Sequence, residues 1–222
     1  MITVEEWLQV MENYGAKIWP VQIIFYTAAI LLTIWLFIRS DRIQNILMKL
    51  YLCIAFIWIG IAFYFIFARG ISGNTYGNYI MGVLFIIVSL LFAVDIFRNK
   101  MYFSLPAVRW QKYTTLVLTV LSFSYPWIGI AFGHRFPNII ITGTVPCPTI
   151  TFSLILLTTS FPRVNKIIYI LLLFLAIPFT PFLQIFKYGV YEDIILFAVG
   201  IYSLVLLVKY WKIKPGSESN TE

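Results

Sequence analysis

The chain repeats one pattern along its length, in which long apolar runs alternate with short polar connections. Each run is close to 20 residues, the length that an α-helix needs to cross the hydrocarbon core of a bilayer. We therefore predict an all-α polytopic bundle of seven transmembrane helices. The predicted helices cover residues 19–38, 47–68, 79–97, 113–132, 139–160, 164–186 and 191–208.

The segments on either side of these runs have a different pattern. Residues 1–18 carry three glutamates and no apolar centre, so they do not have the build of a cleavable signal. Apolar residues recur there at helical spacing, which predicts a short N-terminal amphipathic helix on the membrane interface. Residues 212–222 are polar and predicted to form a disordered cytoplasmic tail, which leaves 19–211 as the transmembrane domain. The apolar stripe of the first segment is Val4, Trp7, Leu8 and Met11.

Composition excludes a soluble protein. The 222 residues are 61% hydrophobic and only 11% charged, which is more apolar surface than one water-soluble core can hide. The lipid bilayer is the expected environment, and the seven runs leave no room for a soluble domain.

The net charge of +7 is distributed unevenly between the two sides of the predicted bundle. Cationic residues on one side are Lys17, Arg69, Arg135 and Lys187. Those on the other side are Arg39, Arg42, Lys49, Arg98, Lys100, Arg109, Lys112, Arg163, Lys166, Lys209, Lys212 and Lys214. The richer side should be cytoplasmic, which predicts an external N-terminus and a cytoplasmic C-terminus. The basic excess thus indicates orientation and contact with anionic lipid, and nucleic acid is not an expected partner.

The fifth run contains an unusual break. Pro146 and Pro148 lack the amide hydrogens that a helix would use at these positions, so two carbonyls lose their donors. The residues before each proline are also pushed away from helical angles. We predict a break at 145–148, with the freed groups facing protein or a wet cavity because lipid cannot satisfy them.

Prolines also lie in the neighbouring helices, at Pro126 in the fourth and at Pro178 and Pro181 in the sixth. Discontinuous helices at a similar depth can build a small polar pocket that opens to the outside. The alternative is that the prolines only kink the helices for packing. The residues predicted to bind a ligand in this pocket are Tyr125, His134, Thr142, Thr144, Cys147, Thr149 and Gln184.

Other chemistry is sparse. One histidine and two separated cysteines do not make the usual first shell of a metal site, so we expect no metal and no cofactor. Cys53 and Cys147 are expected to be reduced thiols. Asp95 precedes Arg98 by three residues, which predicts an ion pair on the surface of one helix.

The chain resembles a bacterial and archaeal family of small multi-pass membrane proteins, domain of unknown function 6064. The resemblance covers nearly the whole chain and departs at Gly15, where an asparagine is expected, and at Tyr64, where a histidine is frequent. It implies a multi-pass protein of the prokaryotic cytoplasmic membrane, and it implies no reaction. It rests on YGAKIWPVQ (14–22), WIGIAFYFIF (58–67), GHRFP (133–137), VPCPTITFSLILL (145–157) and YED (191–193).

Three functional hypotheses follow from these patterns. The first is a small-solute transporter or channel-like protein with an outward-facing pocket at the proline-broken helices. The second is a membrane-embedded enzyme in which His134 works with an outer carboxylate, Glu192 or Asp193. The third is a non-catalytic membrane subunit or sensor. Catalytic residues, the identity of a small-molecule ligand and oligomerisation stay open.

Overall fold

The computed structural model describes residues 4–70 and 75–211, and all regular structure in these two ranges is helical. The predicted C-terminal tail, 212–222, lies outside the described residues. The helices in chain order are α1 (Val4–Ile38), α2 (Arg42–Trp58), η1 (Ile59–Phe67), η2 (Ala68–Gly70), α3 (Thr75–Arg98), α4 (Arg109–Phe123), α5 (Tyr125–Ala131), α6 (Pro146–Thr158), α7 (Lys166–Phe174), η3 (Leu175–Ile185), η4 (Tyr191–Asp193) and α8 (Ile194–Tyr210).

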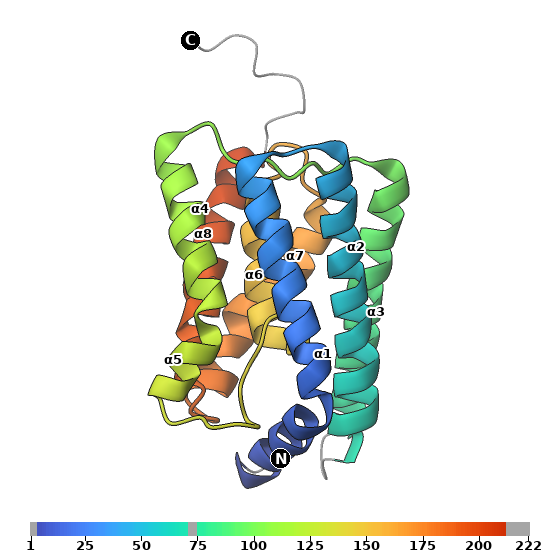
Figure 1. Cartoon of the computed structure of the whole chain (residues 1–222), viewed down its shortest axis with the longest axis vertical. Coiled ribbons are helices and arrows are strands. Elements are labelled where there is room, and N and C mark those ends of the chain that lie inside the picture. Colours follow the sequence, from blue (N-terminus) through green and yellow to red (C-terminus); the bar gives the residue numbers. More distant parts are fainter. Residues whose placement is uncertain (1–3, 71–74, 212–222) are drawn as a thin grey trace.

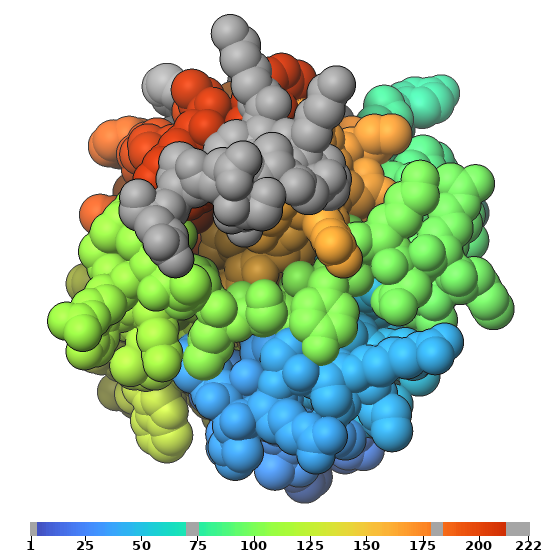
Figure 2. All heavy atoms as spheres, turned by 90° about the horizontal axis from the view of Figure 1, so that it is seen from above, coloured from blue at the N-terminus to red at the C-terminus, as the bar shows by residue number. Residues whose placement is uncertain are grey.

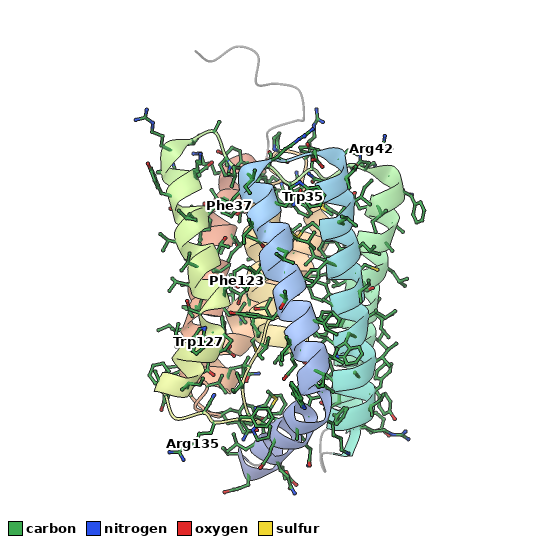
Figure 3. All side chains as sticks on the ribbon, viewed as in Figure 1. Trp35, Phe37, Arg42, Phe123, Trp127 and Arg135 are labelled. Atoms are coloured by element: carbon green, nitrogen blue, oxygen red, sulfur yellow. The ribbon has the colours of Figure 1, made fainter. Side chains whose placement is uncertain are left out.

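The bundle has two distinct ends. The N-terminal end, where α1 begins, is at the bottom of Figure 1, and the C-terminal end, where α8 finishes, is at the top. The α1–α2, α3–α4 and α6–α7 connections all lie at the C-terminal end, so the strongly basic segments gather there. Arg42 lies at this end and Arg135 at the other (Figure 3).

Within residues 4–70 and 75–211, four helical segments are long and apolar enough to cross a membrane: Val4–Ile38, Arg42–Phe67, Tyr76–Arg98 and Tyr191–Tyr210. The pair α4 and α5, bent by 57°, makes a fifth if the two count as one span. Two further apolar helices, α6 and the start of the α7–η3 segment, are shorter. The all-helical, membrane-type bundle is confirmed, whereas length and composition give four or five spans instead of the predicted seven.

The N-terminal segment is the start of α1 and not a separate helix, and its position on the membrane interface stays a prediction. α1 continues through Gly15, and its first turns run at an angle to the rest of the helix (Figure 1). Met11 and Tyr14 are buried in the bundle instead of lying on a surface. A Cβ at Gly15 would lie 1.9 Å from the Pro137 carbonyl oxygen, so the glycine permits close contact between α1 and the 132–145 segment. Tertiary packing therefore holds this part of the helix.

The fifth predicted helix is shorter than expected. Residues 132–145 form no helix, and α6 begins at Pro146 after Val145 in an extended conformation. The predicted helix over 139–145 was wrong, because proline is favoured in the first turn of a helix, where its missing amide hydrogen is not needed. All residues of α6 except Cys147 are buried, which places this helix in the middle of the bundle.

Large apolar side chains cover the outside of the bundle, as expected where lipid surrounds a helix. Ile24 is 66% exposed, Phe97 90% and Val208 70%. A lateral groove of about 530 Å³ separates α1 from α4 and α5, and Phe37, Phe123 and Trp127 lie along it (Figure 3). The groove is almost entirely apolar on its walls.

A buried ion pair joins α2 to α3 at the C-terminal end. Lys49 Nζ lies 2.8 Å from Asp95 Oδ2, and both side chains are nearly inaccessible. Lys49 also donates a hydrogen bond to Asn99 Oδ1 (3.1 Å), and Met101 N donates to Asp95 Oδ2 (3.2 Å). The predicted Asp95–Arg98 pair was wrong, because the carboxylate turns inward to a lysine on the neighbouring helix.

Candidate functional site

A group of ionisable side chains lies inside the bundle near its N-terminal end. The segment 132–145 contributes His134, α6 contributes Cys147, and the short helix η4 contributes Glu192 and Asp193. Tyr125, the first residue of α5, lies beside them. We call these five residues the acidic cluster.

His134 and Glu192 form the first half of the cluster. His134 Nδ1 lies 2.9 Å from Glu192 Oε1, a distance at which the two groups attract as an ion pair once the imidazole is protonated. The Glu192 side chain is fully buried, whereas the His134 side chain is 20% exposed. The histidine therefore connects a buried carboxylate to the surface of the bundle.

The local backbone positions this pair. α5 packs against η4, and the amide of His134 donates to the Gly129 carbonyl (2.9 Å) just after α5 ends. A Cβ on Gly129 would lie 3.0 Å from Glu192 Oε1 and 3.3 Å from His134 Nδ1. The absence of a side chain at Gly129 thus leaves the space in which the imidazole and the carboxylate meet.

Asp193 forms the second half of the cluster. Its side chain is fully buried, with the Cys147 thiol and the Tyr125 hydroxyl beside the carboxylate. Neither neighbour gives a hydrogen bond of ordinary geometry, so both Asp193 oxygens are without a partner among the described residues. Glu192 Oε2 is in the same situation. Buried carboxylates without hydrogen bonds are costly, and such groups are rare outside functional sites.

A small cavity of about 30 Å³ touches the cluster on the side of Asp193. Cys147, Gln184 and Tyr64 are among its lining residues, and the N-terminal turns of α1 contribute Trp7. This volume is enough for about one water molecule. A water there would have polar partners in the carboxylate, the thiol and the Gln184 amide.

The three threonines of the predicted site lie around the start of α6, where the Thr149 hydroxyl stabilises the backbone. Thr149 Oγ1 donates to the Val145 carbonyl (2.6 Å) and accepts from the Gly143 amide (2.8 Å). The Thr144 carbonyl accepts from the Tyr14 hydroxyl (2.6 Å). Thr142 is buried, and its hydroxyl has no partner among the described residues. The prediction that the carbonyls without helical donors face protein is confirmed for Thr144.

The structure thus divides the seven predicted residues into groups. Cys147 and Gln184 line the cavity, while Tyr125 and His134 flank the two carboxylates. Thr142 and Thr144 belong to the turn that precedes α6, and Thr149, in the first turn of α6, accepts a hydrogen bond from that turn. The two cysteines are free thiols, as predicted.

Glu192 shifts the titration of His134. The Glu192 carboxylate beside the imidazole raises the pKa of His134 above the ordinary value of 6.5, and burial acts in the opposite direction. The charges of Glu192 and Asp193 also favour the protonated form. The acidic neighbours therefore favour the imidazolium over the neutral imidazole.

A metal ion is not indicated by this geometry. Among the residues 4–70 and 75–211, no group of three histidine, cysteine, aspartate or glutamate side chains is arranged to hold one. The side chains of the cluster can instead bind protons and hydrogen-bond to water.

Sequence comparison places the chain in a family. Residues 4–214 match the sequence profile of that family, which is nearly the full length. The chain belongs to the family of unknown function DUF6064. No curated protein and no solved structure matches the chain.

Three of the motifs that indicated DUF6064 meet at the acidic cluster. GHRFP supplies His134, the PCPT part of the 145–157 motif supplies Cys147, and YED supplies Glu192 and Asp193. Tyr64, where the resemblance led us to expect a histidine, lines the cavity. The two carboxylates were named only in the enzyme hypothesis, although acidic residues at the start of an apolar run were a usable signal.

Proposed function

We propose that this DUF6064 member is a seven-span protein of the prokaryotic cytoplasmic membrane with its N-terminus outside. The charge asymmetry supports this orientation, because the basic connections share the C-terminal end of the bundle. With 13 residues, α6 is about 20 Å long and too short to cross alone. Residues 140–145 before it, which are buried or half-buried in the bundle, would complete that crossing.

We further propose that the acidic cluster is the proton-binding site of a small-solute transporter or channel-like protein. The observation that carries this proposal is the buried Glu192–Asp193 pair, whose unpartnered oxygens adjoin a partly exposed histidine. Ionisable groups inside a membrane bundle mark proton relays and ion pathways. His134 would exchange protons with the outer solution and Glu192 would pass them inward.

The size of the cavity favours a proton over a larger ligand at this place. Pockets for small molecules measure roughly 300–1,000 Å³. The cavity beside Asp193 holds about 30 Å³. In this conformation the cluster accommodates a water or a proton, and a solute would need a pocket that opens further.

Proton movement in liposomes tests the proposal. The purified protein is reconstituted with a pH-sensitive dye inside the vesicles, and a potassium gradient with valinomycin imposes a membrane potential. We expect the wild type to change the internal pH faster than protein-free vesicles, and Glu192→Gln to lose the difference. Glu12→Gln is the matched control, because Glu12 is an exposed carboxylate of α1. Equal rates for the wild type and Glu192→Gln would contradict the proposal.

Thiol labelling tests access from the outside. In a Cys53→Ala background, Cys147 should react with a small water-soluble maleimide added to the N-terminal side when the pocket opens beyond the present cavity of about 30 Å³, which Cys147 lines. Labelling should be faster when Trp7 is replaced by alanine, because Trp7 lines the same cavity. If Cys147 resists the reagent in both backgrounds, the proposal of an outward-facing pocket is wrong.

A membrane-embedded acid–base enzyme is the second candidate. The 2.9 Å separation of His134 Nδ1 and Glu192 Oε1 favours it, because a carboxylate in that position orients an imidazole for proton transfer. If the protein is such an enzyme, the internal pH of the proteoliposomes should change no faster than that of protein-free vesicles. Co-purification of a partner in equal amounts would instead favour a subunit or sensor.

A further inference from the structure

A second polar cavity lies at the C-terminal end of the bundle, away from the acidic cluster. It has a volume of about 340 Å³ and is bordered by the end of α3, the residues that follow it and the start of α7. Figure 2 views this end, where the green segment after α3 lies beside the orange start of α7. Four cationic side chains line the cavity: Arg98, Lys100, Arg163 and Lys166.

The cations of this cavity are largely uncompensated. Arg98, Lys100 and Arg163 are exposed and take part in none of the ion pairs among the described residues. Lys166 Nζ donates to the Trp211 carbonyl (2.8 Å), which leaves two of its three donors. The cavity therefore has a net positive charge.

The one carboxylate among the lining residues does not neutralise them. Asp95 is buried and already paired with Lys49 at 2.8 Å. Its second neighbour is the amide of Met101, which donates to the same carboxylate. An anion that entered the cavity would therefore meet arginine and lysine without repulsion from a free acid.

Apart from Asn165, the remaining wall of the cavity is apolar. Leu91 and Val94 lie one to two turns before Arg98 on α3, and Ile167 follows Lys166 on α7. Val94 is 44% exposed and Ile167 61% exposed. A cationic rim above an apolar wall matches a molecule with an anionic head and a hydrocarbon chain. A soluble anion would make no favourable contact with the apolar wall.

We propose that this cavity binds an anionic phospholipid, with the phosphate between Arg98, Lys100 and Arg163 and an acyl chain along Val94 and Ile167. Arginine and lysine bind phosphate oxygens through charge-assisted hydrogen bonds, and basic pockets between membrane helices are suited to such headgroups. The inference is independent of the proton site at the opposite end.

Native mass spectrometry of the delipidated full-length protein tests the proposal. The protein is titrated with phosphatidylglycerol and, separately, with phosphatidylcholine of the same chain composition. We expect preferential binding of phosphatidylglycerol, and about thirtyfold weaker binding in Arg98→Gln/Arg163→Gln, because each cation near an anionic lipid contributes a factor of about five.

Two further variants distinguish a bound lipid from nonspecific charge attraction and from a soluble anion. Arg109→Gln/Lys112→Gln removes two exposed cations at the same end but outside the cavity, and it should bind like the wild type. Val94→Trp fills the apolar wall and should weaken phosphatidylglycerol binding while all four cations remain. Thermal melting in detergent checks that each variant is folded.

Three outcomes would overturn the proposal. Equal losses in the cavity variant and the Arg109/Lys112 control would indicate nonspecific charge attraction. Equal binding of phosphatidylcholine and phosphatidylglycerol would show that the cations do not select an anionic headgroup. Displacement of phosphatidylglycerol by inorganic phosphate, with Val94→Trp behaving like the wild type, would assign the cavity to a soluble anion.

Discussion

Both ends of the bundle bury carboxylate side chains, but the carboxylates differ in the number of partners that surround them. At the C-terminal end, Asp95 has Lys49 at 2.8 Å and the Met101 amide at 3.2 Å. At the N-terminal end, Glu192 has one partner, His134, and Asp193 has none of ordinary geometry. A carboxylate with satisfied oxygens locks helices together, whereas one with free oxygens is available to bind a proton or water. The comparison distinguishes a structural acid from a functional one.

The largest expected effect is on the structural pair. Lys49→Met removes the cation from a buried carboxylate and should lower the stability of the protein by about 3–5 kcal/mol. Unfolding of the purified protein in detergent measures the change. Lys49→Met/Asp95→Leu should recover much of the loss, because no unpaired charge remains. A Lys49→Met protein as stable as the wild type would mean that Asp95 is not held by this pair.

The same isosteric change should have opposite consequences at the two ends. Asp95→Asn should be destabilising, while Asp193→Asn should leave stability unchanged or raise it by about 1 kcal/mol, because the buried charge had no partner to lose. Unfolding measurements on the two variants side by side check this. A large loss in Asp193→Asn would show that Asp193 is a structural residue like Asp95.

Crowding at Gly129 should disturb the His134–Glu192 pair modestly. Gly129→Ala forces the two groups apart by a few tenths of an ångström, with an expected loss of about 1 kcal/mol. Gly200→Ala is the control, because its Cβ would meet only apolar contacts at 3.1 and 3.2 Å. Both variants should lose stability, but only Gly129→Ala should also slow proton movement in vesicles.

The smallest expected effect is on the pH dependence of stability. Because Glu192 raises the pKa of His134 above 6.5 in the folded protein, the pair stabilises the fold fully below that value. This contribution is lost as pH rises from 6.5 through the raised pKa. Melting temperatures in detergent should therefore fall over this window, and Glu192→Gln should flatten the fall. If the melting temperature of the variant falls with pH as steeply as that of the wild type, Glu192 does not cause the pH dependence.

The sequence predicted the helical class, the apolar segments and the region of interest, because these follow from local pattern. Apolar run lengths located the helices, and Pro146 marked the point where regular helix begins. Local pattern could not show that Gly15 lies against Pro137. This contact packs the start of α1 against the bundle. It also paired Asp95 with the nearest cation in sequence, whereas the partner is 46 positions away in the chain at Lys49.

The acidic cluster shows the same limit at the site. His134, Cys147 and the carboxylates come from three separate segments, and only the fold brings them together. The proline pattern indicated Cys147, which lies between the two prolines at the start of α6 and lines the cavity. The unpartnered state of Asp193 depends on what surrounds it in space, which no motif records.

Infrared difference spectroscopy during a pH titration is the most direct test of the claim that the acidic cluster exchanges a proton. The protein is reconstituted in nanodiscs, and the carboxyl C=O stretching region is compared between the wild type, Glu192→Gln and Asp193→Asn. We predict a pH-dependent carboxyl band in the wild type that at least one of these two substitutions abolishes. A carboxyl band that both variants retain unchanged, or the absence of any titrating buried carboxyl in the wild type, would contradict the account.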